Sequence, residues 1–233
     1  MARWRWVLAG SAALLVLALV AFVAFGLGGG SATGGQDIAY GEALERFPSE
    51  TASDVVSWAD QVSVVTAVAA TEIPEEDVPP AREAAGEGMI NRNVTFRIDR
   101  TIWHREGAPS LEGTFDAVKY GWVLHDFKRT RFAAMGTPWT EVGSQYLMPL
   151  AYDHDRWLPI LPAAVFAYEG GHVTPVEYQD TALAKQLSGD TLDQATAVFD
   201  TAQPDPAAAK HFDLQPTARQ KAIIAEREAE AGR

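Results

Sequence analysis

The amino-acid sequence predicts a mainly β protein, a small antiparallel barrel with an N-terminal transmembrane helix and C-terminal helices. Three observations lead to this prediction. An uncharged run from Val7 to Leu27 follows two arginines, short segments of alternating hydrophobicity fill roughly 60–178, and helical spacing returns over 179–233. The chain has 233 residues, of which 47% are hydrophobic. This composition favours one folded domain with appendages over a disordered chain.

The first segment predicts where the protein resides. A helix of Val7–Leu27 spans roughly 30 Å, the thickness of the hydrocarbon core of a bilayer. Arg3 and Arg5 favour a cytoplasmic N-terminus, so the rest of the chain is expected outside the cell membrane. The alternative is a signal peptide cleaved near Gly30-Ser31-Ala32. The predicted parts are a cytoplasmic flank at 1–6, a signal anchor at 7–27, a flexible linker at 28–36, a helix and barrel domain at 37–178 and a helical extension at 179–233.

Composition excludes several classes of function. The chain has no cysteine, which excludes a disulfide scaffold, a thiolate metal site and a cysteine nucleophile. Its formal net charge is −12, and all 31 Asp and Glu residues follow Gly35. An acidic surface is repelled by phosphate backbones and by anionic lipid headgroups. We therefore expect no nucleic-acid partner and no docking on membranes through a basic patch.

Strands are predicted where apolar residues recur at every second position. In Asn93–Asp99, Val94, Phe96 and Ile98 alternate with polar residues, and Arg100 breaks the alternation, which is typical of a bulge. The other expected strands are Val62–Val68, Phe115–Leu124, Gln145–Tyr152, Trp157–Leu161, Ala164–Tyr168 and His172–Val176. The expected helices are Ala39–Phe47, Ser53–Ala59, Thr181–Gln186, Thr191–Ala202 and Pro216–Arg233. The expected core residues are Val64, Val94, Phe96, Ile98, Tyr146, Met148 and Leu150, with Thr95, Arg97 and Asp99 facing water.

An acidic stretch, Glu72–Gly88, separates two of these strands. Its prolines disfavour regular structure, and it holds one basic residue, Arg82, among several acids. Two hypotheses follow from this composition. The stretch is a solvated, disordered insertion, because it buries too little apolar surface to offset its ordering entropy. Alternatively, it steers a basic partner towards the domain.

One pattern of segments resembles a known type of barrel. The resemblance rests on three segments, Ala59-Asp60, Asn93–Asp99 (NVTFRID) and Gly143–Leu150 (GSQYLMPL). They are similar to uncharacterised bacterial proteins that are exported, signal-anchored and contain an OB-like barrel. This barrel belongs to the netrin-like and metalloprotease-inhibitor-like branch. The resemblance covers about 53–176 and implies a small antiparallel OB-like barrel. Inhibitors of this branch act through an N-terminal cysteine, which this chain lacks. The resemblance therefore assigns no functional residue.

Two sets of residues are candidate sites. Asp153, His154 and Asp155 form the one dense cluster of metal-ligating side chains, and their oxygens and imidazole suit a divalent cation. The same residue types also occur in hairpin turns, where they satisfy their own backbone. Trp103 and Trp139 are expected to be partly exposed and to contribute to a binding surface. The chain has no nucleophile elbow, no phosphate-binding loop and no helical pair of histidines.

These features together favour a non-enzymatic function. We expect a single-pass, membrane-anchored β-barrel domain outside the cytoplasm that binds a protein partner or a cell-envelope component, without a cofactor. The alternative is an enzyme of the cell envelope, such as a metal-assisted hydrolase, with Asp153, His154 and Asp155 at its site. An enzyme is expected to bring His, Asp or Glu from distant segments into one pocket, whereas a binding module is expected to show an exposed apolar patch.

Overall fold

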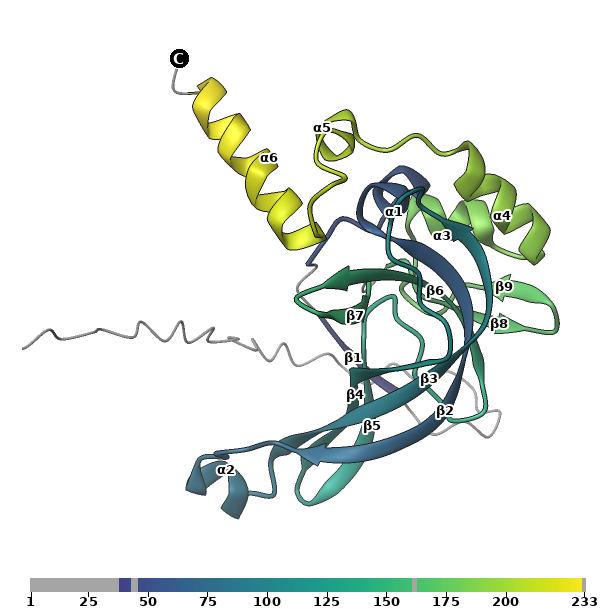
Figure 1. The fold of residues 1–233 in the computed structure, drawn as a ribbon. Helices are drawn as coiled ribbons and strands as arrows, with labels where there is room; N and C mark the ends of the chain where they lie inside the picture. Colours follow the sequence, from purple (N-terminus) through teal and green to yellow (C-terminus); the bar gives the residue numbers. More distant parts are fainter. Residues whose placement is uncertain (1–37, 43–45, 161–162, 232–233) are drawn as a thin grey trace, which may run out of the picture. The chain divides into compact units, whose positions relative to one another are not determined.

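A computed structural model describes residues 38–42, 46–160 and 163–231, which include one nine-stranded sheet (Figure 1). The strands are β1 (Ile38–Gly41), β2 (Gln61–Pro74), β3 (Gly88–His104), β4 (Thr114–His125), β5 (Lys128–Ala134), β6 (Gln145–Asp153), β7 (Arg156–Pro159), β8 (Phe166–Glu169) and β9 (His172–Thr174). The helices are α1 (Ala52–Trp58), α2 (Pro80–Ala84), α3 (Ala182–Leu187), α4 (Leu192–Thr201), α5 (Pro206–Ala209) and α6 (Pro216–Ala231). The prediction of a mainly β domain with C-terminal helices is confirmed.

The sheet is curled but open. Its strand order is β1-β5-β4-β3-β2-β6-β8-β9, and β7 pairs with β6 beside this path. The long strands β2 and β3 curve together (Figure 1). Within the described part of the chain, the end strands β1 and β9 do not pair with each other, so the meander forms a half-barrel rather than a closed barrel. The β1–β5 pairing is parallel, and the remaining pairings are antiparallel.

Bulges between β2 and β3 account for part of this curvature. The register shifts at three places along the pair, and at one of them the partner changes from Arg100 to Ile98 between Val64 and Val65. The extra residue, Asp99, lies next to Arg100, which confirms the bulge expected there. A bulge bends the strand and increases its right-handed twist.

The two faces of the sheet carry separate hydrophobic cores. Val65, Phe96 and Met148 belong to one core, which is formed largely by strand residues. Val64 belongs to the other, in which sheet residues pack against the helices. The alternation of Val64 and Val65 between the cores is the period-2 pattern of a strand buried on both sides. Six expected core residues are buried, and Ile98 is half-buried. The six are Val64, Val94, Phe96, Tyr146, Met148 and Leu150.

Threonine caps fix the starts of the helices that cover the second core. Thr51 begins α1 with a capping box, in which its side chain accepts the Asp54 N–H and the Asp54 carboxylate accepts the Thr51 N–H. Thr181 and Thr191 cap α3 and α4 in the same way through their hydroxyl groups. The caps orient the buried faces of these helices, which contribute Leu183, Leu187 and Phe199 to the core.

The expected helix over Ala39–Phe47 is wrong at its start. Ile38–Gly41 is strand β1, because its backbone pairs in parallel with Arg131–Ala134 of β5. Gly41 permits a close approach at this pairing, since a Cβ atom there would lie 2.5 Å from the Phe132 ring. Backbone pairing with the edge of β5 therefore outweighs the helical spacing of the local sequence.

The expected disordered loop over Glu72–Gly88 is also wrong. Strand β2 continues to Pro74, strand β3 begins at Gly88, and α2 lies between them. Both oxygens of Glu75 accept hydrogen bonds from Arg82, at 3.0 and 3.3 Å, and one also accepts the Met89 N–H at 3.0 Å. The single basic residue of the stretch thus orders the connection by pairing with one of its acids.

The predicted signal anchor at 7–27 lies outside the described residues. Among the residues that are described, no helix is long and apolar enough to span a bilayer. The described residues form one compact unit, in which the C-terminal helices share a core with the sheet.

Candidate functional site

Asp153 ends β6, and His154 and Asp155 form the two-residue turn that joins β6 to β7. His154 and Asp155 have φ angles of 52° and 60°, the left-handed conformation that two-residue hairpin turns of type I′ require. Asp153 is fully buried, whereas His154 and Asp155 are exposed. The turn therefore directs only the first carboxylate into the protein.

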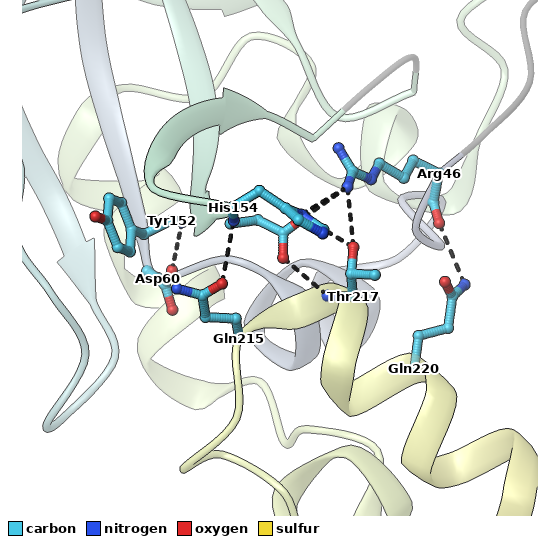
Figure 2. Close-up of polar contacts among 8 residues, drawn as sticks. Arg46, Asp60, Tyr152, His154, Gln215, Thr217 and Gln220 are labelled. Carbon is cyan, nitrogen blue, oxygen red and sulfur yellow. Dashed lines mark hydrogen bonds and ion pairs between the residues drawn. The ribbon is translucent and has the colours of Figure 1, made fainter. Parts of the chain in front are cut away.

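The buried carboxylate of Asp153 binds the N-terminus of α6. Figure 2 shows Thr217 at this end of the helix, beside His154. Its Oδ1 accepts the Thr217 N–H at 3.1 Å, and its Oδ2 accepts the Thr217 hydroxyl at 2.8 Å and the Arg46 guanidinium at 2.6 Å. His154 Nδ1 lies 2.9 Å from the same Oδ2. Thr217 is in the first turn of α6, where N–H groups lack helical partners and the helix dipole favours negative charge.

Further hydrogen bonds attach α6 to the same region. The His154 N–H donates to Gln215 Oε1 at 3.1 Å, and Gln220 Nε2 donates to the Arg46 carbonyl at 3.2 Å. Figure 2 shows Gln215 beside His154, and Gln220 farther along α6 beside the Arg46 carbonyl. Within the described ranges, no group of three or more His, Cys, Asp or Glu side chains is placed to hold a metal ion. The arrangement anchors a helix, and nothing in it favours a metal centre at Asp153, His154 and Asp155.

The ionisation of Asp153 controls this attachment. Burial raises the pKa of Asp153, but hydrogen bonds from Thr217 and His154 and the charge of Arg46 outweigh burial, so its pKa lies below the usual value. A carboxyl group with a lowered pKa stabilises the fold above its unfolded pKa of about 3.9. This stabilisation is lost as the pH falls through the still lower pKa of the folded state.

We expect Asp153→Asn to weaken the attachment of α6 by about 1–3 kcal/mol at neutral pH, because the bonds from Arg46 and Thr217 lose their charged acceptor. Denaturant unfolding of the full chain from pH 7 to pH 2 measures the effect. Wild type is expected to approach the variant below about pH 4. Asp155→Asn is the matched control, since Asp155 is exposed in the same turn. Equal losses in the two variants would contradict the role of Asp153.

A second polar cluster lies beneath the same helix. Arg105 forms an ion pair with Asp60, whose other oxygen accepts the Tyr152 N–H at 2.6 Å. The Phe212 ring lies between two arginines, with its centroid 4.8 Å from Arg105 Cζ and 4.9 Å from Arg219 Cζ. Arg219 is fully buried, and burial together with the charge of Arg105 lowers its pKa to about 10. This cluster is structural, because its charged groups are enclosed by the protein.

The two predicted binding tryptophans lie in different surroundings. Trp103 is half-buried and packs against the core beneath the helices. Trp139 is half-buried 5.6 Å from Trp122, and Arg92 lies 4.7 Å from its ring centroid. Arg131 stacks on the same ring at 5.2 Å. Arginines therefore already cover Trp139, and the structure does not bring the two tryptophans into one binding surface.

An open groove lies between β4 and β7, and we take it as the candidate functional site. Its volume is about 650 Å³. Phe115, Ala117 and Val118 of β4 line one side. Arg156, Trp157 and Leu158 of β7 line the other, with Arg46 nearby. The groove thus combines an apolar surface with positively charged groups.

Sequence reasoning missed the groove and most of the partners of Asp153. Arg46 is 107 residues from Asp153, and Thr217 is 64 residues from it. No local spacing links residues that are so far apart in the chain. The alternation of Phe115 and Ala117 in β4 was a usable signal, but it does not reveal that one edge of this strand borders a groove.

Comparisons with protein-family models, with curated proteins and with solved structures find no match to this chain.

Proposed function

We propose that this chain is a non-enzymatic binding protein, anchored in the cell membrane by residues 7–27, whose β domain lies outside the cytoplasm and binds a protein partner or a cell-envelope component. The groove between β4 and β7 is the observation that carries the binding proposal. Its volume of about 650 Å³ is in the range of ligand sites, roughly 300–1,000 Å³. The long apolar run after Arg3 and Arg5 supports the anchor and its orientation.

The chemistry of the groove suits binding. Its lining is mostly apolar, with Arg46 and Arg156 as its cationic groups and Asp116 as an anionic one. Such a surface gains affinity from burial of apolar area and gains orientation from a few charges. The residues that line it include no histidine. No observation among the described residues favours the hydrolase alternative.

The OB-like class of the domain belongs to the same proposal. Three features support the OB-like class: strands β2, β3, β4 and β5 follow one another as antiparallel neighbours, β2 and β3 are bulged and curved, and a hydrophobic core lies inside the curled sheet. In barrels of this type, ligands bind on the curved sheet and its neighbouring loops. The position of the groove beside β4 agrees with this general scheme.

Site-specific photo-crosslinking in the membrane of the producing cell tests the proposed function. The crosslinking residue replaces Val118, whose side chain is 61% exposed in the groove. The matched control replaces Val142, which is 47% exposed in the β5–β6 loop. We expect a defined adduct from position 118 that is absent from position 142. No adduct, or the same adducts from both positions, would contradict binding in the groove.

The location requires its own measurement. Protease treatment of intact cells is expected to remove the domain, and mass spectrometry of the membrane-extracted protein is expected to find residues 7–27 retained. A mature N-terminus near Thr33, or a domain that is protected in intact cells, would contradict the anchor.

A further inference from the structure

The turn between β4 and β5 displays an aromatic side chain on a strained backbone. Phe127 is 76% exposed, the highest value among the large hydrophobic residues that the structure describes. Asp126 and Phe127 have φ angles of 49° and 59°, in the left-handed region where Asn and Gly are the favoured turn residues. A bulky side chain there is strained, and at this exposure it buries little apolar area. Turn formation therefore does not explain a phenylalanine at this position.

The Phe127 ring lies on the backbone just after α2. The Phe127 N–H donates to the Gly86 carbonyl at 3.2 Å. A Cβ atom at Gly86 would lie 2.6 Å from two atoms of the Phe127 ring, so glycine permits this close approach. The β4–β5 turn and the connection between β2 and β3 are thus joined at one end of the sheet. We name this end, consisting of segments 75–87 and 125–128, the Phe127 tip.

Helix α2 adds an apolar stripe to the Phe127 tip. None of the residues of α2 is buried. Ala81, Ala84 and Ala85 are exposed, and their spacing of three and four positions places them on one side of the helix. The helix lies at the end of the long β2–β3 pair, away from the helices that cover the second core (Figure 1). Neither Phe127 nor the three alanines belong to the two cores, so their contribution to folding is small.

Acidic residues surround this apolar surface. The two segments of the Phe127 tip hold six Asp and Glu residues against one Arg and one Lys. Glu76, Asp77 and Glu83 are exposed in the same segment as the alanines. An apolar centre with a polar rim is the usual anatomy of a protein–protein interface, and a large aromatic residue is its common anchor. The Phe127 tip has this anatomy with a negatively charged rim.

Charge distinguishes three kinds of occupant for this surface. A bilayer with anionic headgroups is repelled by an acidic rim. A second copy of this chain carries the same net charge of −12 and is repelled as well. A protein that places Lys and Arg around an apolar pocket is attracted, because its charges are complementary to those of the tip. The composition of the tip therefore favours a basic protein.

We propose that the Phe127 tip is a docking surface for a basic partner protein, and that the Phe127 ring occupies an apolar pocket of this partner. Glu76 and Glu83 face Lys and Arg residues of the partner and accelerate association. The surface is separate from the groove, because no residue of the tip lines the groove. The inference goes beyond the proposed function, since it assigns a second binding surface to the domain.

Photo-crosslinking of the full-length chain in the cell that produces it tests this surface. The photoreactive analogue p-benzoylphenylalanine replaces Phe127. Tyr178 is the matched control position, because it is also aromatic, 58% exposed and at positive φ. We expect a defined adduct from position 127 that is absent from position 178. Mass spectrometry is expected to identify the second component of the adduct as a protein with a net positive charge, which is then purified for binding measurements.

Substitution of the anchor separates binding from folding. In the full-length chain in lipid nanodiscs, Phe127→Asn is expected to weaken binding of the captured protein at least about tenfold. The same variant is expected to keep or raise the denaturation midpoint, because Asn adopts the left-handed backbone more readily than Phe. Tyr178→Asn is expected to leave binding unchanged. A purely structural role of Phe127 predicts the reverse, a lower midpoint with unchanged binding.

A second pair of variants tests the acidic rim. The double substitution Glu76→Gln and Glu83→Gln is expected to lower the association rate constant at least about threefold at low salt and to change the dissociation rate constant little. High salt is expected to remove this difference. The control is Glu228→Gln with Glu230→Gln, which removes the same charge from the exposed end of α6 and is expected to change neither rate constant.

Several outcomes would overturn the docking surface. They are the absence of an adduct from position 127, the same adducts from positions 127 and 178, and an adduct with lipid or with a second copy of the chain. Binding of the captured protein that ignores Phe127→Asn, or association that ignores the loss of the acidic rim, would overturn it as well. Crosslinking from position 118 reports on the groove alone, so this inference and the proposed function fail separately.

Discussion

Replacing Phe96 with alanine is expected to lower the free energy of unfolding by about 3–5 kcal/mol. Phe96 is fully buried between β2 and β4, and its ring stacks on Phe115 at 5.3 Å between centroids. It also meets Tyr146 edge-on at 6.4 Å. Truncation removes the transfer free energy of the ring and leaves a cavity, because neighbours on three strands cannot all close on it. Denaturant unfolding of the full chain in detergent measures the change.

The neighbouring residue is the control for this prediction. Thr95 points to the opposite face of β3, is half-exposed and donates a hydrogen bond to Asp116 at 2.6 Å. Thr95→Ala is therefore expected to cost about 0.5 kcal/mol. A comparable loss at both positions would mean that the register of β3 differs from the one described, since a shift by one residue exchanges the two faces.

The parts of the fold that follow local patterns were predictable. Alternation located β3 and β6, and helical spacing over Ser53–Ala59 located α1, because these signals lie within a few neighbouring residues. Strand β5 was not predicted. Its sequence Lys128–Ala134 begins with charged residues, and the turn before it consists of Asp126 and Phe127, both at positive φ. A two-residue turn of this kind is normally indicated by Asn-Gly or Asp-Gly, and a bulky phenylalanine conceals it.

The Asp153 cluster and the groove were less predictable, because their parts come from distant segments. The residues Asp153, His154 and Asp155 were identified as a cluster, and the hairpin-turn interpretation agrees with their left-handed backbone. Their attachment to α6 was not predicted, since sequence spacing does not report a contact with Thr217. The free edge of β4 over 114–121, where no described strand pairs, was equally hidden. It exists because β5 pairs with β4 only from Trp122 to His125.

Asp60→Asn is expected to destabilise the domain by about 3–5 kcal/mol, because it removes the carboxylate that pairs with Arg105 in a buried cluster. Asparagine has nearly the volume of aspartate, so packing is preserved and charge is the main variable. Its amide accepts at one atom only, whereas Asp60 accepts from both Arg105 and the Tyr152 N–H. The neighbouring charge of Arg219 also loses an opposite charge.

A double variant distinguishes charge pairing from loss of shape. If the cost comes from an unpaired buried cation, Asp60→Asn combined with Arg105→Met is expected to lose less stability than the sum of the two single variants. Additive losses would instead assign the cost to hydrogen bonds that each residue makes separately, such as that of Asp60 with the Tyr152 N–H. Asp205→Asn serves as the control for an aspartate that also accepts a backbone N–H, that of Ala207, but is exposed. Its expected cost is below about 1 kcal/mol, because water remains available to both partners. A large coupling between Asp60 and Arg105 alone would establish that this buried ion pair holds the end of β6, the β3–β4 connection and the segment around Phe212 together.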